Sequence, residues 1–487
     1  MHELKGLLEG LEYRTTGENI DGLCVSEVVY DTRKLKKDCV FICIHGTNFD
    51  GHDFASEAVI AGAKAVVVEK DVILPEGSAV CVVRVKKTRL ALAYMSAAYF
   101  GHPADKLKTI GVTGTKGKTT TTYLIKHILE HAGHKVGLVG TIETIIGSEH
   151  IPSKNTTPES YLLQQYFSEM VTAGIDTVVM EVSSQALMMD RTSGFTFDIG
   201  VFTNLSPDHI GPGEHKDFED YLHCKSLLFS NCETGIVNGD DEHTEDILKD
   251  CTCRVKRFGL SDKNDLRAGN ISLIKKEGFI GVNFDVKGLM DFNTDAAFPG
   301  RFSVYNALCA IEVCNEFGVS VEDIKESLIN AKVKGRIEMI PVSDDFVLMI
   351  DYAHNAMALE SLLETLKEYD PERLVCLFGC GGNRSKLRRF EMGEVSGRLA
   401  DFTIITSDNP RFEEPLAIME DIETGIKKTD GQYIMIQDRK EAIAYAITHA
   451  KKGDVIVLAG KGHEDYQEIR GNKYPMDERV LIKEITG

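Results

Sequence analysis

The sequence has a deficit of positive charge, no cysteine pair with metal-site spacing and no long apolar run. Its 487 residues include 55 Lys and Arg against 75 Asp and Glu, which gives a formal net charge of −20. A general nucleic-acid-binding protein needs a basic face for phosphate backbones, and this acidic balance argues against one. Local binding of anionic ligands by loops and helix N-termini is still open.

Two further absences concern targeting and redox state. No stretch has the length of a membrane-spanning helix, and residues 1–19 lack the apolar core of a signal peptide. The twelve cysteines are scattered, and the nearest pair, Cys251 and Cys253, does not have the spacing of a zinc site. We therefore expect a cytoplasmic, monomeric chain with free thiols, no nucleic-acid partner and no membrane insertion.

The length and the alternation of segments predict an α/β protein of about three domains, at roughly 150 residues per domain. Residues 1–105 mix short apolar runs with helical patterns, and Gly101-His102-Pro103 marks a linker. Residues 106–333 and 334–487 alternate apolar strands with helices, as parallel sheets do. The expected domains are a small α/β N-terminal domain, a central P-loop mononucleotide-binding parallel-sheet domain and a C-terminal Rossmann-like domain.

Short apolar runs give the strongest strand predictions. They lie at residues 109–113, 177–180, 198–202, 235–238, 346–350, 374–378, 402–406 and 455–458. Polar residues or glycines follow each of these runs, and open α/β sheets place their ligand sites at the carboxyl ends of strands. We therefore expect the functional residues to lie in these strand-end loops.

A glycine-rich loop follows the first predicted strand of the central domain. Its seven residues are Gly114, Thr115, Lys116, Gly117, Lys118, Thr119 and Thr120. Gly114 and Gly117 let the backbone approach phosphate oxygens, and the N–H groups of the next helix point at the anion. Lys118 adds a positive charge, and Thr119 offers a hydroxyl to magnesium. Val112 stands where the strict P-loop pattern has its first glycine, so the loop is a shortened form.

Three more polar residues of the central domain are candidates for a metal site. Glu181 follows an apolar run, so it is either a magnesium ligand near the phosphate loop or a solvated surface glutamate. His209 alone is weak evidence, because most histidines are structural or exposed. Lys225 lies on a predicted helix, where a surface lysine is the ordinary interpretation. From the residues alone, the chain is an enzyme that uses ATP and magnesium.

Taken together, the motifs resemble the Mur ligases of peptidoglycan synthesis. The matching segments, in chain order, are residues 114–120, 181–184, 204–209, Lys225, 351–354, 408–411 and 460–464. The resemblance covers essentially the whole chain, and it is greatest to the members that extend UDP-N-acetylmuramoyl-L-alanyl-D-glutamate by a third peptide residue. The order and spacing of the motifs carry it, since each short motif alone is weak.

The resemblance implies an ATP-dependent amide ligase that forms ADP. ATP would phosphorylate the substrate carboxylate to an acyl phosphate, and the amine of an incoming amino acid would displace the phosphate. The protein's part would be positioning and charge neutralisation. The implied catalytic residues are Lys118, Glu181, His209 and Lys225. The implied metal ligands are Thr119 and Glu181 for one Mg²⁺, and His209 and a carbamate on Lys225 for a second.

The resemblance also implies contacts to the nucleotide and to the muramyl substrate. Asn306, Arg336 and Asp351 match the family's contacts to the adenine, phosphate and ribose of ATP. The segment around Thr32 resembles the uridine-binding segment, where serine is commoner. The remaining contacts to the sugar and peptide would be Asn155, Thr156, Thr157, Ser183 and Arg191. One departure is the stretch 210–215, which is about two residues longer than usual.

The last domain bears on the choice of amino acid. The family's diaminopimelate contacts match Arg384, Asp408, Asn409, Arg411, Gly460 and Glu464. In the family, Asp-Asn-Pro-Arg marks enzymes that take meso-diaminopimelate, because a guanidinium can hold the distal carboxylate in a bidentate fork. The alternatives are a lysine-adding Mur ligase, a ligase like folylpolyglutamate synthase, and a nucleotide-binding switch that does not ligate.

Overall fold

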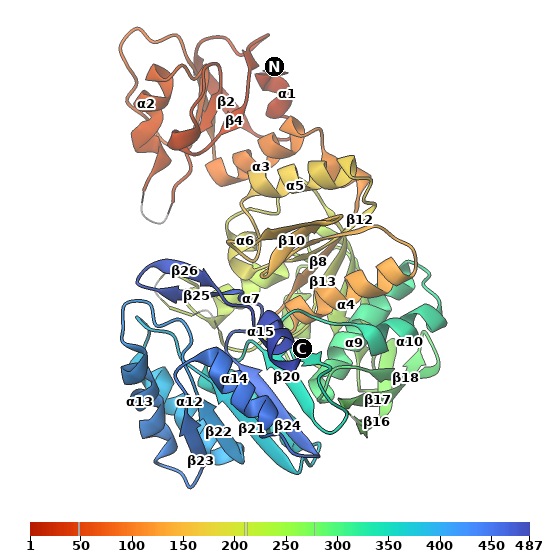
Figure 1. Cartoon of the computed structure of the whole chain (residues 1–487). Helices are drawn as coiled ribbons and strands as arrows, with labels where there is room; N and C mark the ends of the chain where they lie inside the picture. Colours follow the sequence, from red (N-terminus) through yellow and green to blue (C-terminus); the bar gives the residue numbers. More distant parts are fainter. Residues whose placement is uncertain (47–48, 209, 212, 277) are drawn as a thin grey trace. The chain divides into compact units, whose positions relative to one another are not determined.

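The computed structural model describes residues 1–46, 49–208, 210–211, 213–276 and 278–487 (Figure 1). Its contacts divide the chain into two compact units. Unit 1 comprises Met1–Asp265 and Cys309–Val319, and unit 2 comprises Leu266–Leu308 and Ser320–Gly487. The three domains bounded at residues 105 and 333 stay a prediction. Among the described residues, no helix has both the length and the apolar character needed to cross a membrane.

The N-terminal part of unit 1 contains a five-stranded sheet. In spatial order its strands are β2 (Tyr13–Gly17), β7 (Cys81–Val85), β6 (Ala65–Val68), β5 (Val40–Ile42) and β4 (Val28–Val29). All neighbours pair in parallel except β2 with β7. Val40 and Ile42 enter one apolar cluster while Phe41 enters another. The sheet is therefore buried on both faces, as parallel sheets are.

The central sheet of unit 1 has a parallel body. Its order is β9 (Val136–Val139), β12 (Thr177–Glu181), β8 (Lys108–Thr113), β13 (Phe197–Phe202), β14 (Cys232–Asn238) and β15 (Arg254–Gly259). The hairpin β10 (Glu143–Ile146) and β11 (Glu149–Pro152) extends the β9 edge in antiparallel fashion. Val112 of β8 lies opposite Glu181 on one side and Val201 on the other. The carboxyl ends of β8, β12 and β13 are therefore level.

Helices connect these strands and cover the central sheet. They are α4 (Lys118–His131), α5 (Ser160–Thr172), α6 (Ser184–Met188), α7 (Phe218–Ser226) and α8 (Thr244–Ile247). The helix α3 (Thr88–Tyr99), which follows the N-terminal sheet, packs against α5 (Figure 1). Leu163 and Phe167 of α5 are fully buried in the cluster that also contains Val178 and Met180 of β12.

Unit 2 contains a six-stranded sheet near the C-terminus. Its order is β19 (Glu338–Ile340), β20 (Val347–Asp351), β24 (Asp454–Ala459), β21 (Arg373–Phe378), β22 (Phe402–Ile405) and β23 (Gln432–Met435). Among the described strands of this sheet, only β19 and β20 pair in antiparallel fashion. One face is covered by α11 (Ala356–Lys367), α12 (Lys386–Leu399) and α13 (Pro415–Ile426), and the other by α14 (Arg439–Thr448) and α15 (Glu478–Thr486).

Unit 2 also contains an antiparallel meander that precedes this sheet in the sequence. Its strands are β16 (Leu266–Lys276), β17 (Phe279–Gly288) and β18 (Phe292–Ala296), and α10 (Val321–Asn330) packs beside β18. The buried hydroxyl of Tyr369 donates to the carbonyl oxygen of Gly281 at 2.8 Å and accepts from the N–H of Gly300 at 3.0 Å. These bonds attach the meander to the helical layer of the C-terminal sheet.

The α/β class and the strand positions predicted from the apolar runs are confirmed. Seven of the eight predicted strands occur within one residue of their expected bounds, and the eighth, expected at 235–238, is β14, which begins three residues earlier at Cys232. The meander β16–β18 was not predicted, and neither was the hairpin β25 (Tyr466–Ile469) and β26 (Asn472–Pro475).

Candidate functional site

The glycine-rich loop connects the carboxyl end of β8 to α4, as its sequence predicts. Gly114 has φ +148°, and a Cβ atom there would overlap the hydroxyl oxygen of Thr203. Gly117 has φ +84° and caps α4 at its N-terminus. Both positions therefore require glycine. The first N–H groups of α4 have no partner within the helix, which makes this end suited to a phosphate.

A second loop, after β13, braces the glycine-rich loop. Asn204 accepts the N–H of Thr115 at its carbonyl oxygen and the N–H of Lys116 at Oδ1, both at 2.9 Å. The hydroxyl of Thr203 donates to the carbonyl oxygen of Lys116 at 2.7 Å. The ammonium group of Lys118 donates to the carbonyl oxygens of Gly114 and Thr115 at 2.8 and 3.1 Å. Thr203 was not among the predicted site residues.

Glu181 lies at the carboxyl end of β12 and is 1% exposed. The surface interpretation of this carboxylate is therefore wrong. The hydroxyl of Thr119 donates to its two oxygens at 3.0 and 3.1 Å, and Thr141 donates its N–H at 2.8 Å and its hydroxyl at 3.0 Å. A carboxylate beside a threonine hydroxyl offers the oxygen donors that Mg²⁺ prefers. Thr141 has no motif of its own, and sequence reasoning missed it.

Lys225 lies on α7 and is 1% exposed, so the surface interpretation is wrong here too. Its Nζ donates to the carbonyl oxygen of Gly114 at 2.9 Å and lies 4.6 Å from the ring centroid of Tyr221. Burial, followed by the charge of Lys118, holds the pKa of Lys225 well below its usual range. His209, the other predicted ligand of this region, lies outside the described residues.

A pocket of about 350 Å³ opens beside these groups in unit 1. Of the predicted residues, it is lined by Lys118, Asn155, Thr156, Thr157, Ser183 and Arg191. The lining residues that sequence reasoning missed are Thr141, Lys154, Ser184, Gln185 and Glu214. Lys118, the predicted phosphate contact, and the predicted contacts to the muramyl peptide therefore share a single pocket.

The predicted peptide contacts are fixed to the end of β12. The buried hydroxyl of Thr157 donates to the carbonyl oxygen of Glu181 at 2.9 Å and accepts the N–H of Ser183 at 3.0 Å. Arg191 donates to the carbonyl oxygen of Thr157 at 3.1 Å. Thr32 is not among the lining residues of this pocket. It begins a short 3₁₀ turn, Thr32–Lys34, which is capped by the side chain of Asp31.

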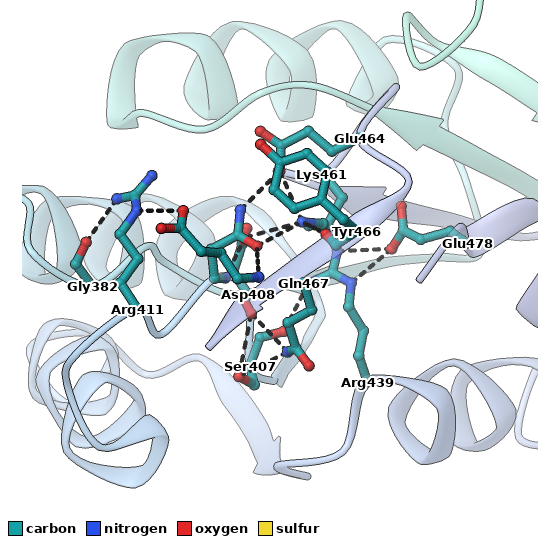
Figure 2. Close-up of polar contacts among 12 residues, drawn as sticks. Gly382, Ser407, Asp408, Arg411, Arg439, Lys461, Glu464, Tyr466, Gln467 and Glu478 are labelled. Carbon is teal, nitrogen blue, oxygen red and sulfur yellow. Dashed lines mark hydrogen bonds and ion pairs between the residues drawn. The ribbon is translucent and has the colours of Figure 1, made fainter. Parts of the chain in front are cut away.

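In unit 2, the loops after β22 and β24 form a polar cluster (Figure 2). Lys461 is fully buried at its centre, and its ammonium group donates to Asn409 Oδ1 at 3.1 Å and Glu464 Oε2 at 2.8 Å. Asn409 Nδ2 donates to the same Glu464 oxygen at 2.8 Å, and Asp408 lies 3.7 Å from Lys461. Lys461 belongs to the 460–464 motif but was not predicted as a site residue.

Arg411 adopts the left-handed backbone region, with φ +51°. Its Nε donates to Glu468 Oε2 at 3.1 Å and its Nη1 to the carbonyl oxygen of Gly382 at 2.7 Å (Figure 2). Arg384 is exposed on the loop before α12, and both arginines border Gly381. Gly460 donates its N–H to the carbonyl oxygen of Asp351 at 3.0 Å.

The three residues predicted to contact ATP beyond its phosphate loop belong to unit 2. Asn306 is buried on α9 (Arg301–Glu316), and the guanidinium of Arg336 lies 4.6 Å from the ring centroid of Tyr352. Asp351 accepts the N–H groups of Ile337 and Ala353, both at 2.8 Å. Burial raises the pKa of Asp351 above its ordinary value. The phosphate loop belongs to unit 1.

Comparison with protein families matches three segments of the chain. Residues 25–102 match the model described as Mur ligase family, catalytic domain. Residues 112–314 match the Mur ligase middle domain, and residues 335–462 match the Mur ligase, glutamate ligase domain.

Two curated relatives and one solved structure extend these matches over the chain. A protein of Caldanaerobacter subterraneus subsp. tengcongensis is 44% identical over 486 residues, covering 99% of this chain and 98% of its own length. One from Clostridium acetobutylicum is 44% identical over 466 residues, covering 94% of each. Both are named UDP-N-acetylmuramoyl-L-alanyl-D-glutamate--2,6-diaminopimelate ligase, the second with the number 1. A solved structure with the same name has a TM-score of 0.71 at 28% identity, covering 95% of this chain and 94% of its own.

Proposed function

Since the chain belongs to the Mur ligase family, we propose that it adds meso-diaminopimelate to UDP-N-acetylmuramoyl-L-alanyl-D-glutamate with hydrolysis of ATP to ADP. The reaction would serve peptidoglycan precursor synthesis in the cytoplasm, with the protein acting as a monomer. The observation that carries the proposal is the pocket of unit 1, which Lys118 lines together with the predicted peptide contacts. Its support from relatives is the identity of 44% along nearly the whole chain.

The residues of this pocket suit phosphoryl transfer to a carboxylate. The free carboxylate of the muramyl dipeptide would lie against Thr157, Ser183 and Arg191, and the outer phosphates of ATP against Lys118 and the N-terminus of α4. Two anions would then meet beside a fixed cation, which is a matter of positioning and charge neutralisation. Asn306, Arg336 and Asp351 stay the predicted contacts to the rest of the nucleotide.

Magnesium fits the donor set at the end of β12. Thr119 and Glu181 supply a hydroxyl and a carboxylate within hydrogen-bonding distance of each other, and such hard oxygen donors are typical of Mg²⁺ sites. A bound Mg²⁺ would neutralise charge on the phosphates and polarise their oxygens. His209 stays the predicted ligand of a second ion.

Lys225 has the properties that a carbamylation site needs. Carbamylation requires the neutral amine, and burial holds the pKa of Lys225 well below its usual range. Carbon dioxide would add to Nζ with loss of a proton, which would turn a buried amine into a carboxylate-like anion beside the phosphate loop. This carbamate would be the partner of His209 at the second ion.

The polar cluster of unit 2 would hold diaminopimelate. Asn409 and Glu464 suit its distal ammonium group, because both present oxygen acceptors around the buried Lys461. Arg411 would bind the distal carboxylate, which lysine lacks. Arg384, Asp408 and Gly460 complete the predicted contacts.

The test is an assay of ADP release. We expect release that depends on both the UDP-muramyl dipeptide and meso-diaminopimelate, together with a product whose mass equals the sum of the two substrates less one water. Release that depends on a folate and glutamate would instead identify a ligase of the folylpolyglutamate type. ATP hydrolysis without any amide product would indicate a nucleotide-binding switch.

A further inference from the structure

Three side chains of unit 1 form a hydrogen-bonded chain that leads from the pocket through a buried histidine to a partly exposed carboxylate. Ser184, at the start of α6, lines the pocket, and its Oγ lies 2.8 Å from Nε2 of His215. His215 is completely buried, and its Nδ1 lies 3.0 Å from Oδ2 of Asp220 in the first turn of α7. A serine, a histidine and a carboxylate in this order are the groups of a proton relay.

The direction of these hydrogen bonds follows from the groups themselves. The carboxylate of Asp220 can only accept, so Nδ1 of His215 must donate to it. In the neutral imidazole, which is the form that can take up a proton, the other nitrogen is an acceptor, so the hydroxyl of Ser184 donates to Nε2. Ser184 consequently offers only lone pairs to the pocket, and it needs a ligand that brings a donor.

The charged groups that line the pocket indicate which substrate group would contact Ser184. Lys118, Lys154 and Arg191 are cations suited to phosphate and carboxylate groups, while Glu214 is the carboxylate among the described lining residues. Phosphates and carboxylates bring acceptors, so they do not match Ser184. The amide N–H groups of the muramyl dipeptide and the incoming amine both bring N–H donors. Of these, only the amine must lose a proton for the reaction, so it is the donor for which an acceptor chain has a chemical role.

We propose that Ser184, His215 and Asp220 accept the proton of the attacking amine, with Ser184 as the catalytic residue that touches it. Behind it, His215 accepts the proton, and Asp220 is a positioning residue that stabilises the imidazolium. This inference rests on the proposed ligase activity and adds to it a base for the second half of the reaction.

The step balances as follows. The incoming ammonium group gives one proton to Oγ of Ser184, while the hydroxyl proton of Ser184 passes to Nε2 of His215. The resulting imidazolium is paired with Asp220. The neutral amine then forms the C–N bond to the acyl carbon, and the C–O bond to phosphate breaks with the electron pair leaving on the phosphate. The departing phosphate takes the second N–H proton, and His215 returns its proton to solvent.

A metal site is the competing interpretation of the same group. His215, Asp220 and Cys224 offer ligand atoms that all lie within 4.8 Å of one another. Both ring nitrogens of His215 already have hydrogen-bond partners. Burial also raises the pKa of the Cys224 thiol to about 11, and metals bind the thiolate. The relay keeps the hydrogen bonds of His215 to Ser184 and Asp220, whereas a bound metal would have to replace at least one of them.

The experiment separates the two half-reactions in the variants Ser184→Ala, His215→Gln and Asp220→Asn. Acyl phosphate formed from ATP and the UDP-muramyl dipeptide is trapped by borohydride reduction, and amide formation with meso-diaminopimelate is followed by mass spectrometry. Hydroxylamine serves as a second acceptor, because it is already neutral near neutral pH and needs no base. Ser396→Ala is the matched control, since it removes a buried hydroxyl that bonds Thr403 in unit 2.

We expect acyl phosphate formation and attack by hydroxylamine to be unchanged in the variants, while amide formation falls about 10²-fold or more. The control should retain amide formation. A parallel loss of acyl phosphate and amide, or no loss of amide formation, would overturn the relay. Ser184→Ala decides the matter if the His215 variant does not fold, because it removes a single hydroxyl. Failure of the wild type to form acyl phosphate would instead refute the proposed function.

Discussion

At the scale of single residues, Lys225 and Arg411 are the two basic side chains with the most specific predicted roles, and they differ in burial. Lys225 is buried on α7 beside the phosphate loop, and its local sequence gives no sign of this. Arg411 keeps about a quarter of its side chain exposed and is held by Glu468 and Gly382. The first is suited to modification and the second to a ligand.

A carbamate on Lys225 would be directly observable. With ¹³C-labelled bicarbonate, we expect a carbamate carbon signal in the wild type that is absent from Lys225→Ala. We expect ligation to fall about 10²- to 10³-fold in the variant, as when one preorganised charge-stabilising group is removed. An unmodified amine in an enzyme that is turning over would refute the assignment.

The role of Arg411 is best tested with Arg411→Asn. Arg411 has φ +51°, and asparagine tolerates this region better than alanine, so the variant removes the guanidinium with less backbone strain. We expect kcat/KM for meso-diaminopimelate to fall about 10²- to 10³-fold, because the hydrogen-bonded ion pair to the distal carboxylate is lost. The kcat/KM of Arg411→Lys should lie between that of Arg411→Asn and that of the wild type. An equal effect on L-lysine as acceptor would show that Arg411 does not read the distal carboxylate.

At the scale of elements, the phosphate loop depends on close contact with the loop after β13. Gly114→Ala places a Cβ atom onto Thr203, whereas Gly133→Ala, at φ +94°, meets open space. Both substitutions place an L side chain at positive φ, which strains the backbone by about 1 to 3 kcal/mol. We expect ATP turnover to be lost in Gly114→Ala and retained in Gly133→Ala. Calorimetric nucleotide binding measures the difference, and equal binding by both variants would contradict the packing argument.

The predicted strands of the central and C-terminal sheets could be found because they are continuous apolar runs, as in parallel sheets buried on both faces. Another strand of the central sheet, β15, has no such run and was not predicted. The meander β16–β18 was missed because its buried residues are interspersed with half-buried ones, so no continuous apolar run marks its strands. The phosphate loop could be predicted because glycine spacing is a local signal. Ser184 and His215 could not be paired from sequence, because they are 31 residues apart and meet only in the fold.

At the scale of the whole molecule, the free energy of unfolding should depend on pH in acid because of His463, a residue of the 460–464 motif. Burial, followed by the charges of Arg336, Lys334 and Arg479, lowers the pKa of His463 from 6.5 to about 4. Between these values the unfolded chain binds more protons than the folded one, so this group makes the free energy of unfolding fall as pH falls from about 6.5 to about 4. Above that window it has no effect.

His463→Gln removes this contribution. We expect its free energy of unfolding to be flatter across the window, with a difference from the wild type of about 3 kcal/mol at most. Denaturant titrations at several pH values, followed by signals from unit 2, measure it. Parallel curves for the two proteins would show that His463 titrates normally in the folded state.

The choice of amino acid is the central claim for the molecule as a whole, because it separates this ligase from a lysine-adding member of its family. The direct measurement is an ATP-dependent reaction with UDP-N-acetylmuramoyl-L-alanyl-D-glutamate and equal concentrations of meso-diaminopimelate, L-lysine and L-ornithine, analysed by product mass. The account predicts that the product carries diaminopimelate almost exclusively. A product carrying lysine or ornithine would contradict it.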